Sequence, residues 1–290
     1  MCDQHTHDNL DAMLARRGLT RRQFAAMGAT TALAACAPAG KAATASDLNE
    51  RDVAITTADG TADGFFVAPA KGPSPGVIMW PDIAGLRDAY KVMARRLAGA
   101  GYAVLVPNPY YRSAKAPILN SLSEWFEPEK QARLKPMMAL VDGAATARDS
   151  TAFAAWLDQQ AEADSKRGIG VCGYCMGGSH AVRSAAAVPE RIKAACSFHG
   201  AQLVTGKADS PNLLMARTKA HFLFAIGRDD DAKTPEEKTV LRAAAATDRP
   251  VEAEVYPADH GWCTLDAPSY DKPQAEKAWG RMLATFEAAL

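Results

Sequence analysis

Residues 173–178 read Gly-Tyr-Cys-Met-Gly-Gly and place Cys175 in the middle of a glycine-rich segment. An apolar run at 169–172 precedes the segment and an alanine-rich run follows it, which indicates a buried strand, a tight turn and a helix. In that context the segment has the form of a nucleophile elbow, Gly-x-Ser-x-Gly, with cysteine in place of serine. The glycines let strand and helix approach closely, and the helix N-terminus favours a thiolate. The chemistry predicted for Cys175 is nucleophilic attack on a carbonyl.

Such a nucleophile needs a histidine base and an acid that orients the histidine, and both follow Cys175 in the expected order. Three aspartates at 229–231 come after the apolar run 222–226, and His260 comes after the alternating run 251–255. His260 therefore has the position of the base, in a loop after the last predicted strand. The other histidines of this region lie in or at the ends of predicted elements, where core or capping roles are expected: His180, His199 and His221.

Cys172 and Cys175 also have the Cys-x-x-Cys spacing of a redox motif, so a thiol-disulfide protein is an alternative. It is the weaker one, because Cys172 falls in a buried strand and would have to move to reach bridging geometry. A zinc site would need a second Cys/His pair, and haem attachment would need a histidine where Met176 stands. We expect no metal and no cofactor. A third alternative is a binding module that keeps the fold without activity.

The elements that must position these groups alternate between strand-like and helix-like patterns from Arg51 onward. Short apolar runs predict strands buried on both faces at 77–80, 103–106, 169–172, 194–198 and 222–226. Helical spacing is found at 90–98, 177–188, 236–246 and 279–290. This alternation predicts an α/β protein with the α/β-hydrolase fold, a mostly parallel sheet with helices on both faces. The polar stretch from Arg112 to Asp142 fits neither pattern and is predicted to form a cap or lid.

The N-terminal part differs from the rest of the chain. The stretch Thr-Arg-Arg-Gln-Phe at 20–24 resembles a twin-arginine export signal, and an uncharged run too short to span a bilayer follows it. Leu-Ala-Ala-Cys at 33–36 resembles a bacterial lipobox, in which Cys36 would be lipidated. We expect a signal peptide at 1–35, a flexible tether at 36–50 and the hydrolase domain at 51–290. Ordinary signal-peptidase cleavage and a chance alanine-rich N-terminus are the alternatives.

This interpretation predicts an exported, periplasmic protein that is anchored to the membrane through lipidated Cys36. The whole chain of 290 residues carries 33 basic and 33 acidic side chains. Nucleic-acid binding, or binding to an acidic membrane surface, would normally show as a basic excess, so we expect neither partner. Membrane contact would then be through the lipid anchor only.

From about Pro75 to Leu290 the chain resembles the dienelactone hydrolase family. The shared motifs are 173–178, the acidic turn closed by Pro235, Tyr-Pro-x-x-His-Gly at 256–261, and Gly101-Tyr102 through Pro107 to Tyr111-Arg112. The resemblance implies a carboxylic ester hydrolase of the carboxymethylenebutenolidase kind. It would act on a small ester or lactone through a thioester, with Cys175 as nucleophile, His260 as base and Asp230 as acid. Asp230 is chosen because relatives often place the acid three residues after the glycine that stands here at position 227; Asp229 and Asp231 are the alternatives.

The α/β-hydrolase fold also predicts an oxyanion hole made of two backbone amides. One belongs to Met176, directly after the nucleophile, and the other is assigned to Ile83, in the loop after the first core strand. The family often has a glutamate just before that second amide, where it influences the resting thiol. This chain has the shorter Asp82 at that position.

Substrate contacts are the part in which this chain departs from the family pattern. Relatives that hydrolyse dienelactone have an arginine four residues after the catalytic histidine, and this chain has Thr264 there. Arg112 and Arg133 are the candidates for binding a substrate carboxylate, and Trp262 offers apolar area beside His260. We therefore expect a preference for neutral substrates.

Overall fold

The computed structural model describes residues 47–244 and 250–290. The expected signal peptide at 1–35, the lipidation site Cys36 and most of the expected tether lie outside the described residues. The first strand starts at Leu48, inside the range expected for the tether, so the folded part begins slightly earlier than predicted. None of the helices in the described part is long and apolar enough to span a membrane.

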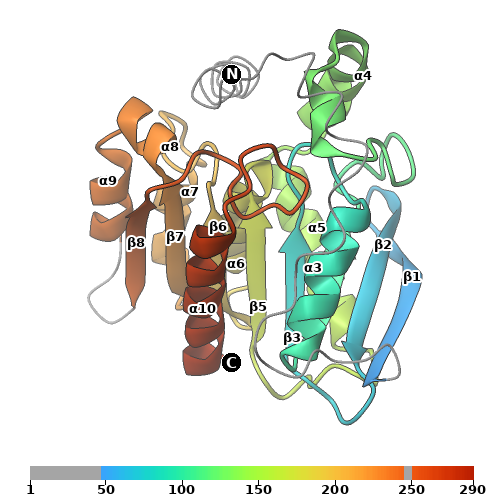
Figure 1. The fold of residues 1–290 in the computed structure, drawn as a ribbon. Coiled ribbons are helices and arrows are strands. Elements are labelled where there is room, and N and C mark those ends of the chain that lie inside the picture. Colours follow the sequence, from blue (N-terminus) through green and yellow to red (C-terminus); the bar gives the residue numbers. More distant parts are fainter. Residues whose placement is uncertain (1–46, 245–249) are drawn as a thin grey trace.

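An eight-stranded sheet forms the centre of the molecule, in the order β1-β2-β4-β3-β5-β6-β7-β8 (Figure 1). The strands are β1 (Leu48–Thr57), β2 (Gly60–Pro69), β3 (Gly76–Trp80), β4 (Ala103–Pro107), β5 (Ile169–Tyr174), β6 (Ile192–Phe198), β7 (His221–Gly227) and β8 (Val251–Tyr256). Pairing is antiparallel between β1 and β2 and between β2 and β4, and parallel among the others. The mostly parallel sheet predicted from the apolar runs is confirmed.

Helices cover both faces of the sheet. The α-helices of the described residues are α3 (Asp88–Gly99), α4 (Pro128–Ala139), α5 (Gly143–Leu157), α6 (Met176–Ala187), α7 (Pro211–Leu214), α8 (Arg228–Lys233), α9 (Glu237–Ala243) and α10 (Lys272–Ala289). In Figure 1, α3 and α10 lie in front of the sheet, with α5 and α6 behind it. This two-sided cover is the arrangement expected of a parallel sheet, whose crossover helices must bury both of its faces.

The alternation of side chains along the strands divides the apolar interior into two cores. In β3, Val77 and Met79 join the core under α3 and α10, whereas Ile78 and Trp80 join the core under α5 and α6. All five residues of β3 are buried, which is why the strand reads as an uninterrupted apolar run.

A third apolar cluster lies at the carboxyl ends of the parallel strands, under the segment predicted to be a cap. This segment contains a 3₁₀ helix, η2 (Leu122–Phe126), and helix α4, which Figure 1 shows above this end of the sheet. Trp125 and Leu134 of the cap are fully buried and belong to the same cluster as Cys175. The cap therefore packs directly over the predicted nucleophile.

Candidate active site

Cys175 stands at the junction of β5 and α6 in a strained backbone conformation, with φ 52° and ψ −115°. Non-glycine residues rarely adopt a positive φ, and such strain is concentrated at functional sites. The glycines around it are required by space. A Cβ on Gly173 would overlap the Gly177 carbonyl, and one on Gly177 would lie 2.5 Å from the Trp80 oxygen. The strand, tight turn and helix predicted from residues 173–178 are all present.

His260 and Asp230 meet because β7 and β8 are neighbouring parallel strands whose carboxyl ends lie side by side. The Asp230 carboxylate oxygens lie 2.9 and 3.0 Å from His260 Nδ1. Asp229 instead accepts the backbone amide of His260 at 2.8 Å, and Asp231 pairs with Lys238 at 2.6 Å. Of the three candidate acids, Asp230 is the one that faces the imidazole.

The Cys175 side chain also interacts with the imidazole of His260, so Cys175, His260 and Asp230 form one chain of interactions. Burial disfavours the imidazolium, but the negative charges of Asp230 and Cys175 outweigh it and raise the pKa of His260 well above its usual range. This arrangement can hold a proton on His260 beside a thiolate on Cys175.

Two backbone amides are available for an oxyanion. In the loop after β3, Asp82 Oδ1 accepts the Ala84 amide at 2.9 Å and the Asp82 carbonyl accepts the Gly85 amide at 3.0 Å. Within the described parts of the chain, no acceptor is bonded to the amides of Ile83 or Met176. Both residues belong to the apolar cluster that contains Cys175, so these two amides lie in the same part of the molecule as the predicted nucleophile.

The Asp82 side chain is held in an ion pair. Its carboxylate accepts hydrogen bonds from Nη1 and Nη2 of Arg87 at 2.7 and 2.9 Å. Arg87 also forms an ion pair with Asp266 at 2.7 Å. The Arg87 side chain is fully buried. Asp266 lies in the same loop as His260, after β8. Arg87 therefore connects the loop after β3, which contains Asp82 and Ile83 (the oxyanion loop), to the loop that contains His260 (the histidine loop). The sequence does not reveal this role, because Arg87 stands alone at the start of a helix.

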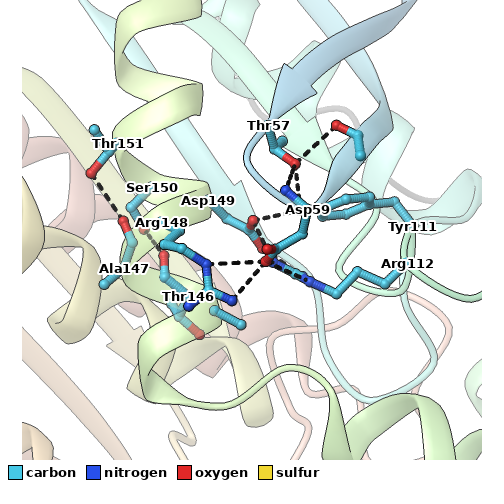
Figure 2. Close-up of polar contacts among 12 residues, drawn as sticks. Thr57, Asp59, Tyr111, Arg112, Thr146, Ala147, Arg148, Asp149, Ser150 and Thr151 are labelled. Carbon is cyan, nitrogen blue, oxygen red and sulfur yellow. Dashed lines mark hydrogen bonds and ion pairs between the residues drawn. The ribbon is translucent and has the colours of Figure 1, made fainter.

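Arg112 lies in a separate polar cluster (Figure 2). Its guanidinium pairs with the buried Asp149 at 2.7 Å and with Asp59 at 2.6 Å. Tyr111 donates to Asp149 as well, at 2.7 Å. These contacts neutralise Arg112, and none of them joins it to the triad. Arg133, the other candidate for binding a carboxylate, is exposed on α4.

Trp262 is fully buried and stacks on Tyr256, with ring centroids 5.3 Å apart. Its other neighbour is His199, whose ring lies edge to face with Trp262 at 5.3 Å and with His260 at 4.8 Å. Trp262 is therefore a buried residue that packs behind the site, and the expectation that it offers apolar surface to a substrate is wrong. The structure places His199 in the site, a position that the sequence analysis misses. The sequence does contain one indication of this position: His199 directly follows β6, and β6 is the neighbour of β5, the strand that ends at the nucleophile.

The remaining thiols lie in the core. The described cysteines are all free and buried, namely Cys172, Cys175, Cys196 and Cys263. Burial raises the pKa of the Cys172 thiol, which opposes the thiol chemistry that the Cys-x-x-Cys alternative requires. Across residues 47–244 and 250–290, no group of three or more histidine, cysteine, aspartate or glutamate side chains is placed to hold a metal ion.

Comparison with known proteins identifies the family. The family model described as "Dienelactone hydrolase family" matches residues 62–290. A relative from Methylorubrum extorquens named "Putative carboxymethylenebutenolidase" is 28% identical over 292 residues, covering 96% of both chains. An Escherichia coli relative of the same name is 28% identical over 221 residues, covering 74% of this chain and 78% of its own.

Solved structures agree with this result. The "Putative Dienelactone Hydrolase" from Klebsiella pneumoniae superposes with a TM-score of 0.69 at 25% identity, covering 83% of this chain and 98% of that one. The chain belongs to the dienelactone hydrolase family and has its α/β-hydrolase fold. It is accordingly a hydrolase of the carboxylic ester class.

Proposed function

We propose that this protein hydrolyses small neutral esters or lactones, with Cys175 as nucleophile, His260 as base and Asp230 as the acid that orients it. The observation that carries the proposal is the unbroken series of interactions from the Cys175 side chain through the His260 imidazole to the Asp230 carboxylate, one oxygen of which lies 2.9 Å from Nδ1. A nucleophile, a base and an orienting acid in this order are the parts that acyl transfer requires.

The proposed reaction has two steps. The Cys175 thiolate attacks the substrate carbonyl, and the amides of Ile83 and Met176 stabilise the negative oxygen of the tetrahedral intermediate. The intermediate collapses to a thioester when the alkoxide leaves, with its proton supplied by His260. His260 then takes a proton from water, which attacks the thioester, releases the acid and regenerates Cys175.

The surroundings of Cys175 support neutral substrates. Cys175 and Met176 pack with apolar side chains of the cap and of the loops beneath it, including Ile83, Tyr110, Leu119 and Trp125. Arg87 and Arg112 are already paired, Arg87 with two aspartates and Arg112 with two others. A substrate carboxylate could use Arg87 or Arg112 as its counter-charge only by displacing one of these pairs.

Hydrolysis of p-nitrophenyl acetate tests the proposal. We expect Cys175→Ala to lower turnover by on the order of a thousandfold or more, since the members of such a triad act as a unit. Cys172→Ala is the matched control, because it removes a thiol from β5, the strand that leads to Cys175, without touching the triad. Equal losses in both variants, together with disulfide reductase activity in the unmodified protein, would favour the redox alternative.

We also propose, from the sequence motifs alone, that the protein is exported and anchored through Cys36. Replacement of both Arg21 and Arg22 by lysine is then expected to leave precursor in the cytoplasm, and Cys36→Ala to abolish labelling by radioactive palmitate. Lipid labelling that persists in the Cys36→Ala variant would contradict the anchor.

A further inference from the structure

We propose that His199 is a positioning residue for the nucleophile: its unprotonated Nδ1 holds the backbone amide of Cys175, and its ring stays neutral beside the protonated His260. This inference rests on the proposed role of Cys175 and His260 and adds a second histidine to the site.

The first observation is that the turn after β6 forms hydrogen bonds with the backbone of Cys175. The Cys175 amide donates to His199 Nδ1 at 3.1 Å and is shared with the Phe198 carbonyl at 3.0 Å. The Cys175 carbonyl in turn accepts the Ala201 amide at 3.0 Å. The segment 198–201 therefore binds both backbone polar groups of the nucleophile, and the His199 side chain supplies one of these contacts.

The second observation is that His199 itself is held in an unfavourable conformation. Its φ is 40°, a region that residues with a side chain seldom adopt, and its exposed fraction is only 1%. The His199 amide donates to the Ala225 carbonyl of β7 at 2.8 Å, which fixes this geometry. A residue that only filled the core would not need a strained backbone, and strain of this kind is concentrated at functional sites.

The third observation concerns the proton on the ring. Because Nδ1 accepts the Cys175 amide, the proton of neutral His199 must be on Nε2. In the described part of the chain, Nε2 is buried and has no oxygen or nitrogen partner. The ring instead meets the rings of His260 and Trp262 edge to face. A charged His199 would lose its acceptor and stand beside a charged His260.

The titratable groups around His199 are His260, Cys175 and Tyr174. Burial and the positive charge of His260 both keep the pKa of His199 well below its usual range. Of the two facing imidazoles, His260 is the one that has a carboxylate partner among residues 47–244 and 250–290, namely Asp230. The proton therefore stays on His260, where the proposed mechanism uses it.

The test compares two substitutions. His199→Asn keeps an acceptor near the position of Nδ1 and tolerates a positive φ, whereas His199→Phe keeps a ring but has no acceptor. We expect the Phe variant to lose about a hundredfold in kcat with little change in KM, the size of effect that follows from a small displacement of a reacting group. The Asn variant should recover most of this loss.

A second readout does not depend on any ester substrate. The pH dependence of Cys175 alkylation by iodoacetamide reports the thiolate, and we expect its midpoint to rise in the Phe variant and to stay near the original value in the Asn variant. Thermal unfolding monitors folding, and His199→Leu carries the same expectation if the Phe variant does not fold. Equal loss in the Asn and Phe variants, or an unchanged alkylation profile in both, would overturn the proposal. Failure of ester hydrolysis in the unmodified protein would overturn the proposed function, while the alkylation profile would still test His199.

Discussion

The carboxylate of Asp229 accepts the backbone amide of His260 at 2.8 Å. The next residue, Asp230, faces the imidazole of the same histidine. Two consecutive aspartates thus fix the main chain and the side chain of one residue separately. Burial and the charge of Asp230 raise the pKa of Asp229, which is consistent with a buried structural carboxylate.

This division of roles predicts different effects for the three aspartates. Asp230→Asn should lower kcat by about 10³- to 10⁴-fold, because the imidazole loses both its orientation and the partner of its charged form. Asp229→Asn should lower the melting temperature together with a smaller loss of kcat, and Asp231→Asn, the matched control, should change kcat least. Steady-state kinetics and thermal unfolding measure both effects. If the Asp229 or the Asp231 variant loses more kcat than the Asp230 variant, the residue replaced in that variant is the triad acid and the assignment of Asp230 is wrong.

Arg87 is predicted to be important for stability. Arg87→Met leaves Asp82 buried without its partner, and breaking a buried ion pair in this way costs about 3–5 kcal/mol. Arg95→Met is the control on the same helix, since the pair of Arg95 with Glu50 is open to solvent and is worth at most about 1 kcal/mol. Urea unfolding gives both values. Equal free energies of unfolding for the two variants would contradict a structural role for the buried pair.

Glu237 is predicted to make stability depend on pH. Burial and the nearby charge of Asp230 raise the pKa of Glu237 from 4.5 to about 7. A carboxyl group whose pKa is raised in the folded state contributes stability below its unfolded pKa and loses that contribution as the pH rises through about 7. Glu237→Gln should therefore raise the melting temperature more at pH 8 than at pH 5, whereas Glu236→Gln at the exposed neighbouring position should not. A difference between variant and parent that is the same at both pH values would contradict the prediction.

The paired arginines predict a preference for uncharged substrates. p-Nitrophenyl butyrate and p-nitrophenyl hemisuccinate have similar length, but only the second carries a carboxylate. We expect the butyrate to have at least about tenfold higher kcat/KM, since Arg87 and Arg112 are already paired and do not offer the hemisuccinate a charge-assisted hydrogen bond worth about 1.5–3 kcal/mol. A tenfold preference for the hemisuccinate would show that an arginine is released for the substrate. Arg112→Gln and Arg87→Lys would then identify which one.

Much of the fold follows from local patterns. Strands that are buried on both faces, such as β3 and β5, appear in the sequence as apolar runs. The glycines of residues 173–178 are recognisable because the tight turn between strand and helix leaves no space for side chains at their positions. The hairpin of β1 and β2 was not predicted, because β1 alternates exposed and half-buried residues and carries charged side chains. Helix α4 lies inside the polar cap segment and contains Pro136, which hides its helical pattern.

Some residues of the site could be predicted from the sequence and others could not. The order of nucleophile, acid and histidine along the chain is visible because each follows a recognisable strand. His199 and Arg87 were missed because their roles come from contacts between segments far apart in sequence, at the ends of neighbouring strands and across the oxyanion and histidine loops. Thr264 illustrates the reverse case: the sequence marks it as the place of a missing arginine, and the structure shows it fully buried.

In the proposed mechanism an acyl group passes through the sulfur of Cys175. Rapid acid quench of the protein with excess p-nitrophenyl acetate, followed by peptide mass spectrometry, can detect this intermediate. We expect an acetyl group on the peptide that contains Cys175, formed as fast as the first turnover and absent from the Cys175→Ala variant. Full turnover with no acyl group on Cys175, or an acyl group on another residue at the same rate, would contradict it.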